Sequence, residues 1–147
     1  MISSGVLEFL GVVVAGFLCG GLLGIPGGAA GGWLNGRYDP IFRIAAPEKQ
    51  LRRTMARQGM SGGIAIGIFL GPICGAVAAP LSAYVSVDTQ VFVSAVGFWL
   101  LFRYLTAEES IVGFPGGPVF AAVFGTVGGH LGRVLIVSWL GFGAPWG

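Results

Sequence analysis

Residues 16–36 of the chain read GFLCGGLLGIPGGAAGGWLNG, with a glycine at every fourth position. Residues four apart lie on one face of an α-helix, so these glycines form a groove that carries no side chains. In a bilayer, where burying leucine against leucine gains little, such grooves let helix backbones approach closely and are a main cause of helix association. The stretch therefore predicts a transmembrane helix that packs through its glycine face. That face consists of Gly16, Gly20, Gly24, Gly28, Gly32 and Gly36.

Two later stretches repeat this four-residue spacing. The second series comprises Gly59, Gly63, Gly67, Gly71 and Gly75, continued by Ala79 and Ala83. The third series comprises Gly113, Gly117, Ala121, Gly125 and Gly129. These three glycine-zipper faces either close the chain's own bundle or leave at least one face for another subunit. Both alternatives stay open, because three such faces leave one unpaired when they pair two by two.

The composition indicates a membrane protein. Only 10% of the 147 residues are charged, whereas 54% are hydrophobic and 28 are glycine. An ordinary soluble domain carries about 25% charged residues, so that class is excluded, and a chain this apolar cannot stay disordered in water. Collagen is excluded because the glycines do not recur at every third position. We therefore predict an all-α, polytopic transmembrane helical bundle of about four spans, which forms one integral membrane domain over residues 1–147.

Four apolar stretches define the expected spans. They cover residues 5–34, 59–87, 91–105 and 111–131. A helix over the first stretch would be about 45 Å long and would exceed the hydrocarbon core of about 30 Å, so it must tilt, break or project. Pro26, within Gly24–Gly28, predicts a break. Residues 132–147 are expected to form a C-terminal interfacial segment, and one long kinked helix over 111–142 is the alternative.

The basic residues are concentrated in one segment, since six of the eight lysines and arginines lie between Asn35 and Gln58. Short loops rich in these residues stay on the cytoplasmic side, so residues 35–58 are expected to form a cytoplasmic basic loop. Within it, Pro47–Gln58 has the pattern of a short amphipathic helix that lies in the headgroups and binds anionic lipid or an acidic partner. Nucleic-acid binding ranks lower, because no aromatic residues alternate with the charges. The binding residues would be Lys49, Arg52, Arg53 and Arg57.

Two polar residues inside apolar stretches are candidate functional groups. Glu8 is the one acid in the first stretch, and an ionisable group in a membrane is by default a functional hypothesis, although a position so near the N-terminus also fits interfacial water. His130 fits either a proton relay or an interfacial hydrogen bond. Cys19 and Cys74 lie in apolar runs, where thiols behave as small buried hydrophobes. No spacing of His, Cys, Asp or Glu indicates a metal site, a catalytic residue or a cofactor.

These features favour a non-enzymatic membrane protein. The leading hypothesis is a structural or assembly subunit of a larger membrane complex, or of a viral or membrane particle, that associates as a homo-oligomer or with other membrane subunits. The alternative is a self-assembling pore or channel. A first span, a basic loop beginning Gly36-Arg37-Tyr38 and then tight hairpin spans resemble the layout of phage holins, and this resemblance implies permeabilisation of the membrane. The lack of paired polar residues at mid-span favours the structural hypothesis, because a hydrated conduit needs a polar lining.

Overall fold

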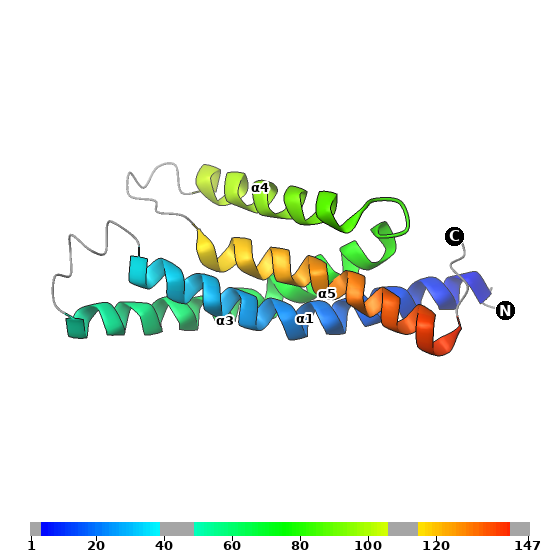
Figure 1. The fold of residues 1–147 in the computed structure, drawn as a ribbon, viewed down its shortest axis with the longest axis horizontal. Helices are drawn as coiled ribbons and strands as arrows, with labels where there is room; N and C mark the ends of the chain where they lie inside the picture. Colours follow the sequence, from blue (N-terminus) through cyan, green and yellow to red (C-terminus); the bar gives the residue numbers. More distant parts are fainter. Residues whose placement is uncertain (1–3, 39–48, 106–114, 142–147) are drawn as a thin grey trace.

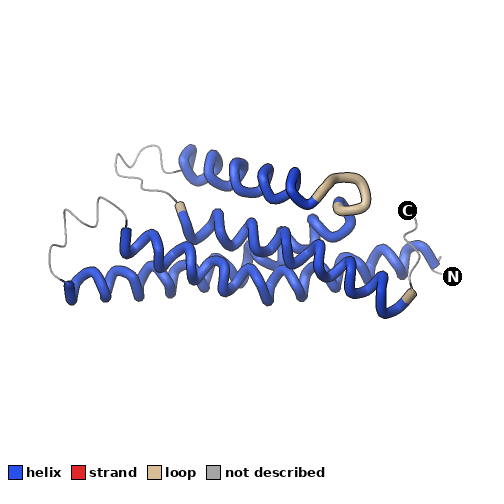
Figure 2. The backbone as a smooth tube through the Cα atoms, viewed as in Figure 1, coloured by secondary structure: helices blue, strands red, loops and turns tan. Residues whose placement is uncertain are grey.

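The computed structural model describes residues 4–38, 49–105 and 115–141, which form four helices and no strand. The helices are α1 (Ser4–Tyr38), α3 (Lys49–Leu81), α4 (Val87–Leu105) and α5 (Gly116–Leu140). They form an elongated bundle (Figure 1), and Figure 2 shows that only short turns interrupt the helical backbone of the described residues. The expected all-α class is confirmed.

Three of the helices are long and apolar enough to cross a membrane, which supports an integral, multi-pass membrane protein. The qualifying segments are Gly5–Arg37, Lys49–Leu81 and Gly116–Trp139. The helix α4 is not among them, although residues 91–105 were expected to form a span. Gln90 and Arg103 leave it an apolar stretch of about 12 residues, or roughly 18 Å, which is shorter than a hydrocarbon core of about 30 Å.

The first helix continues through Pro26, so the expected break at Gly24–Gly28 is wrong. The proline ring is exposed and lies away from the packed faces of α1, where it interrupts the hydrogen-bond ladder without disturbing the packing. With 35 residues the helix is about 52 Å long. Because this exceeds the hydrocarbon core, α1 must tilt or project beyond it instead of breaking.

The third helix also differs from expectation, because its first ten residues are the basic segment Lys49–Gln58. The segment is helical, as predicted, but it continues into the span and is no separate helix lying in the headgroups. The basic segment is rich in good helix formers. Gly59, where it joins the apolar part of α3, lowers helix stability by only about 1 kcal/mol relative to alanine, so the helix continues through it. The helix ends at Leu81, earlier than the expected residue 87, where the hydroxyl of Ser82 donates to the carbonyl of Ala79 at 2.7 Å.

The last helix runs to Leu140 without interruption and ends at Gly141, whose φ of 60° is the left-handed conformation that glycine adopts most easily. The helix therefore does not end near residue 131, and residues 132–140 continue α5 as one helix. The alternative was one long kinked helix over residues 111–142. Residues 111–114 and 142 of that helix lie outside the described residues.

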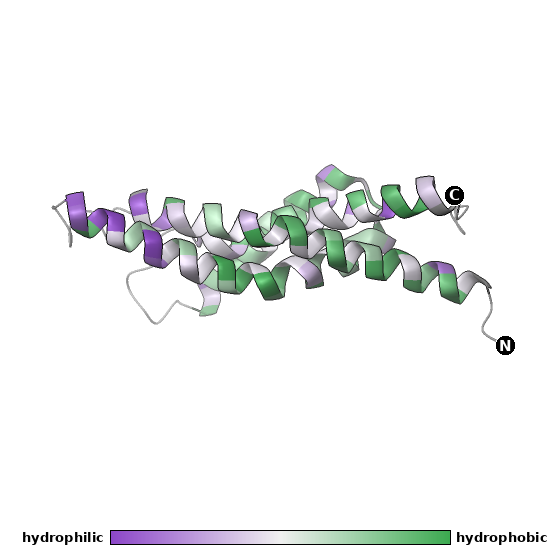
Figure 3. Ribbon diagram, turned by 90° about the horizontal axis from the view of Figure 1, so that it is seen from below, coloured by the Kyte–Doolittle hydropathy of each residue, from purple (hydrophilic) through white to green (hydrophobic). Residues whose placement is uncertain are grey.

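The contacts define the order of the helices. The helix α1 packs against both α3 and α5, these two pack against each other, and α4 packs against α5 (Figure 1). The register of the contacts shows that α1 is antiparallel to α3 and α5, because its later residues meet their earlier ones. One end of the bundle, where α1 ends and α3 begins, is distinctly hydrophilic (Figure 3). We call it the basic end.

Candidate functional site

The glycines of α1 and α3 face one another along the whole contact between these helices. A Cβ atom placed on Gly20 would lie 2.5 Å from the carbonyl oxygen of Gly71, and one placed on Gly67 would lie 2.6 Å from that of Gly24. Closer to the basic end, Gly28 meets Gly63 in the same way. In each case the obstructing atom belongs to the backbone, so it cannot rotate away. The two helices are therefore packed backbone to backbone.

The third glycine series joins this contact from α5. A Cβ on Gly125 would lie 2.7 Å from the carbonyl oxygen of Gly71, and one on Gly71 would lie 2.8 Å from the Cα of Gly24. We call these three glycines the three-helix junction. Gly129 lies similarly against Gly75, whereas Gly113 lies outside the described residues.

Sequence reasoning missed a second glycine face on α1. Gly31 and Gly116 face each other, and the glycines of α5 at 128 and 132 lie against the carbonyls of Cys19 and Ala15. Pairs of adjacent glycines in the sequence could have revealed this second face; they occur at residues 27–28, 31–32 and 128–129. Adjacent helical residues differ in direction by about 100°, so doublets repeated every four residues create two glycine faces on one helix. This pattern lets α1 contact α3 and α5 at the same depth.

A cavity of about 690 Å³ lies between the last turns of α1 and the first turns of α3, at the basic end. Its lining consists of Trp33, Arg37, Lys49, Arg52, Arg53, Ala56 and Arg57. All four cations that the sequence assigned to lipid or partner binding are brought together here. We call this cavity the cationic cleft.

Two features of the cationic cleft were not expected from the sequence. The guanidinium of Arg37 lies 4.9 Å from the centre of the Trp33 ring, a cation–π contact that places a fifth cation on the wall formed by α1. The floor is Ala56, which is only 4% exposed and lies against Gly36. No acidic side chain is among the described residues that line the cleft.

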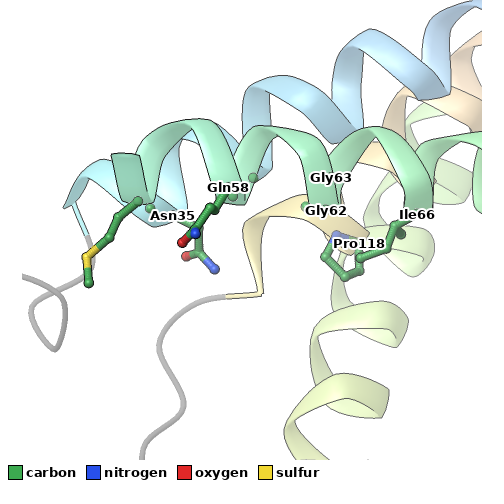
Figure 4. Close-up of a pocket in the computed structure, with 11 residues that line it drawn as sticks. Asn35, Gln58, Gly62, Gly63, Ile66 and Pro118 are labelled. Carbon is green, nitrogen blue, oxygen red and sulfur yellow. The ribbon is translucent and has the colours of Figure 1, made fainter. Parts of the chain in front are cut away.

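A smaller groove of about 270 Å³ opens elsewhere at the basic end (Figure 4). The carboxamide side chains of Asn35 and Gln58 lie next to each other in it, and Gly62, Ile66 and Pro118 extend it toward the bundle. Its polar groups are neutral, so it lacks the charge of the cationic cleft.

The intramembrane candidates Glu8 and His130 lie outside these cavities. Glu8 is half-buried near the start of α1, and no hydrogen bond or ion pair to another described residue is found for it. The Nδ1 atom of His130 is buried and has no hydrogen-bond partner in the described part of the chain. Arg133, one turn further along, donates from Nη1 to the hydroxyl of Ser82 at 3.2 Å and ties α5 to the end of α3.

The outer helix α4 is joined to α5 by a polar contact. The hydroxyls of Ser94 and Thr126 lie 2.8 Å apart, and Thr126 also donates to the carbonyl of Ala122 at 2.9 Å. Because the single hydroxyl hydrogen of Thr126 goes to that carbonyl, Ser94 is the donor between the helices. A cavity of about 440 Å³ lies beside this contact, between α3, α4 and α5.

We expect Thr126→Val to weaken the attachment of α4 and to lower the free energy of unfolding by about 0.6 kcal/mol, the average for an interhelical hydrogen bond in a membrane. Unfolding in detergent, followed by circular dichroism, measures this loss. Thr54→Val is the matched control, because the exposed Thr54 hydroxyl bonds only to the carbonyl of Gln50 in its own helix. Equal losses in the two variants would contradict a role for the Ser94 contact.

The described residues contain no group of three His, Cys, Asp or Glu side chains that could hold a metal ion, and both cysteines are free thiols. No family model, curated protein or solved structure matches the chain. Its function is therefore inferred from its own residues and their geometry.

Proposed function

We propose that this chain is a non-enzymatic integral membrane protein that serves as a structural or assembly subunit of a larger membrane complex or membrane particle. The observation that carries the proposal is the exposed aromatic side chains of α4, because the close glycine contacts among α1, α3 and α5 are all made within one chain. Because these three helices touch through their backbones, their glycine faces are already covered inside the protomer. We infer that this glycine-zipper packing stabilises the protomer, and that association with other subunits or further copies uses other surfaces.

The outer face of α4 is the surface that we assign to such association. The helix packs on α5, and its large side chains that point away from the bundle include Phe92, which is 67% exposed, and Tyr104, which is 80% exposed. Trp99 is exposed between them. Aromatic residues are enriched at protein interfaces, where they bury a large area with few rotatable bonds.

A self-assembling pore is the competing function. Because the backbones of α1, α3 and α5 touch along the described bundle, a water-filled path would have to form between copies and not through one protomer. Few of the exposed side chains in the apolar parts of these helices are polar, whereas a conducting path needs a polar or charged lining.

One experiment separates the two functions. The purified chain is analysed by size-exclusion chromatography with light scattering in mild detergent, and is then reconstituted into liposomes that contain a self-quenched dye. We expect a defined oligomer, or a complex with co-purifying subunits, and no dye release above that of empty liposomes. Release that increases with protein density would replace the structural proposal with the pore. A monomer without partners and without leakage would contradict both functions.

A further inference from the structure

We propose that the cationic cleft is a binding site for a lipid headgroup that ends in a phosphate monoester. The inference goes beyond the structural role proposed above, because it concerns a specific ligand and not assembly. It rests on the convergence of cations from two helices on one cavity: Arg37 belongs to α1, whereas the other four belong to α3.

The spacing of the cationic residues on α3 explains why the cationic cleft is hollow. Lys49, Arg53 and Arg57 are four residues apart and lie in one row along the helix, while Arg52 begins a neighbouring row in which Ala56 comes next. The methyl group of Ala56 leaves space that a longer side chain would fill. Gly36 lets the end of α1 approach at this point, so long cationic side chains surround a shallow floor.

The chemistry of the lining favours phosphate over other anions. Four of the five cations are arginines, whose planar guanidinium groups match the oxygens of a phosphate and can bind two of them at once. Arg37 is already oriented by its contact with the Trp33 ring. A phosphate monoester carries a charge of about −1.5 to −2 at neutral pH, so the cations of the cleft attract it more strongly than they attract a singly charged diester.

The depth of the cleft indicates a lipid as the source of this phosphate. Arg57 comes two residues, or about 3 Å of helix, before Gly59, where the apolar part of α3 begins. Lys49 comes ten residues, or about 15 Å, before the same point. The headgroup layer on each side of a bilayer is about 5–8 Å thick, so the cleft overlaps that layer and begins where the hydrocarbon ends.

The test is a binding titration of the full chain in detergent micelles. Trp33 lines the cleft, so its fluorescence reports binding in a variant whose three other tryptophans are replaced by phenylalanine. Three lipids are compared: phosphatidic acid, phosphatidylglycerol and phosphatidylcholine. We expect saturable binding of phosphatidic acid, at least about tenfold weaker binding of phosphatidylglycerol, and no binding of phosphatidylcholine, because a bond between charged groups contributes enough for a tenfold change.

The variants separate a defined site from general surface charge. Arg53→Gln and Arg57→Gln should each weaken binding of phosphatidic acid by about tenfold, whereas Arg53→Lys, which keeps the charge, should weaken it less. Arg103→Gln is the matched control, because Arg103 is an exposed arginine in the last turn of α4 and does not line the cleft. Circular dichroism and elution volume show that each variant remains folded.

Three outcomes would overturn the proposal. If Arg103→Gln weakens binding as much as Arg53→Gln, the attraction is spread over the surface and the cleft is no site. If phosphatidylglycerol binds as tightly as phosphatidic acid, the second charge is not recognised. If inorganic phosphate alone saturates the fluorescence change at the same concentration as phosphatidic acid, the ligand is a soluble anion and not a lipid.

Discussion

Replacing Gly71 with leucine should separate three helices at once and lower the free energy of unfolding in detergent by more than about 3 kcal/mol, the upper end of the usual cost of overpacking. A Cβ at this position would lie 2.7 Å from the carbonyl oxygen of Gly20 and 2.8 Å from the Cα of Gly24. Both atoms belong to the backbone of α1, and α5 packs on Gly71 through Gly125. Since no side chain can rotate away, whole helices must move.

Gly62→Leu is the matched control on the same helix. A Cβ placed on Gly62 meets nothing within 4 Å, so leucine can be accommodated there without displacing a neighbour. The control should leave stability unchanged or raise it by up to about 1 kcal/mol, because leucine favours a helix more than glycine does. Thermal unfolding followed by circular dichroism measures both variants. Similar midpoints for the two would show that the glycine contacts do not stabilise the bundle.

The second prediction concerns the orientation of the protein in the membrane. In intact cells, we expect a thiol reagent to label a cysteine at one end of the bundle completely and a cysteine at the other end not at all. We propose that the basic end faces the cytoplasm, because the last turn of α1 carries Arg37 and the first ten residues of α3 carry its four cations. The last turn of α4, which carries Arg103, also ends toward this side of the bundle (Figure 1). A cysteine at Gln50 should therefore be shielded from an impermeant thiol reagent added outside intact cells. A cysteine at Thr89, which is exposed in the first turn of α4, should react fully, because α4 begins away from the basic end (Figure 1).

The native thiols require a matched background for this experiment. Cys74 is buried and Cys19 is half-buried, so both are replaced by alanine before the single cysteines are introduced. Permeabilised cells supply the control, because Gln50→Cys must then react as well as Thr89→Cys. Labelling of Gln50→Cys alone in intact cells would invert the proposed orientation.

Much of the fold was accessible from the sequence, because it depends on periodicity. The shortage of charge indicated a membrane bundle, and the four-residue glycine spacing picked out positions that lie at helix contacts, such as Gly20, Gly71 and Gly125. The sequence also singled out the four cations of α3 that line the cationic cleft, since their spacing places them on neighbouring rows of a helix. These inferences are local, and each needs only the geometry of a single helix.

The failed expectations depend on tertiary contacts. Pro26 suggested a break because its missing hydrogen bond is visible in the sequence, whereas the packing of α1 against two helices is not. Residues 132–140 remain helical because Gly132 packs against Ala15 and Arg133 bonds to Ser82, a partner 51 residues away in the chain. Arg37 was noted only as a charge. Its role as one wall of a cleft requires knowing that the end of α1 meets the start of α3.

The two glycine faces of α1 have a consequence for biogenesis. A chain is synthesised from its N-terminus, so α1 enters the membrane before α3 and α5 and meets α3 first. The face that includes Gly31 packs against α5, so it has no partner until α5 leaves the ribosome. During that interval the insertion machinery or lipid must cover an open glycine groove. The helix α1 thus completes its packing only after α5 has been synthesised, and a chain truncated before α5 would keep this groove exposed.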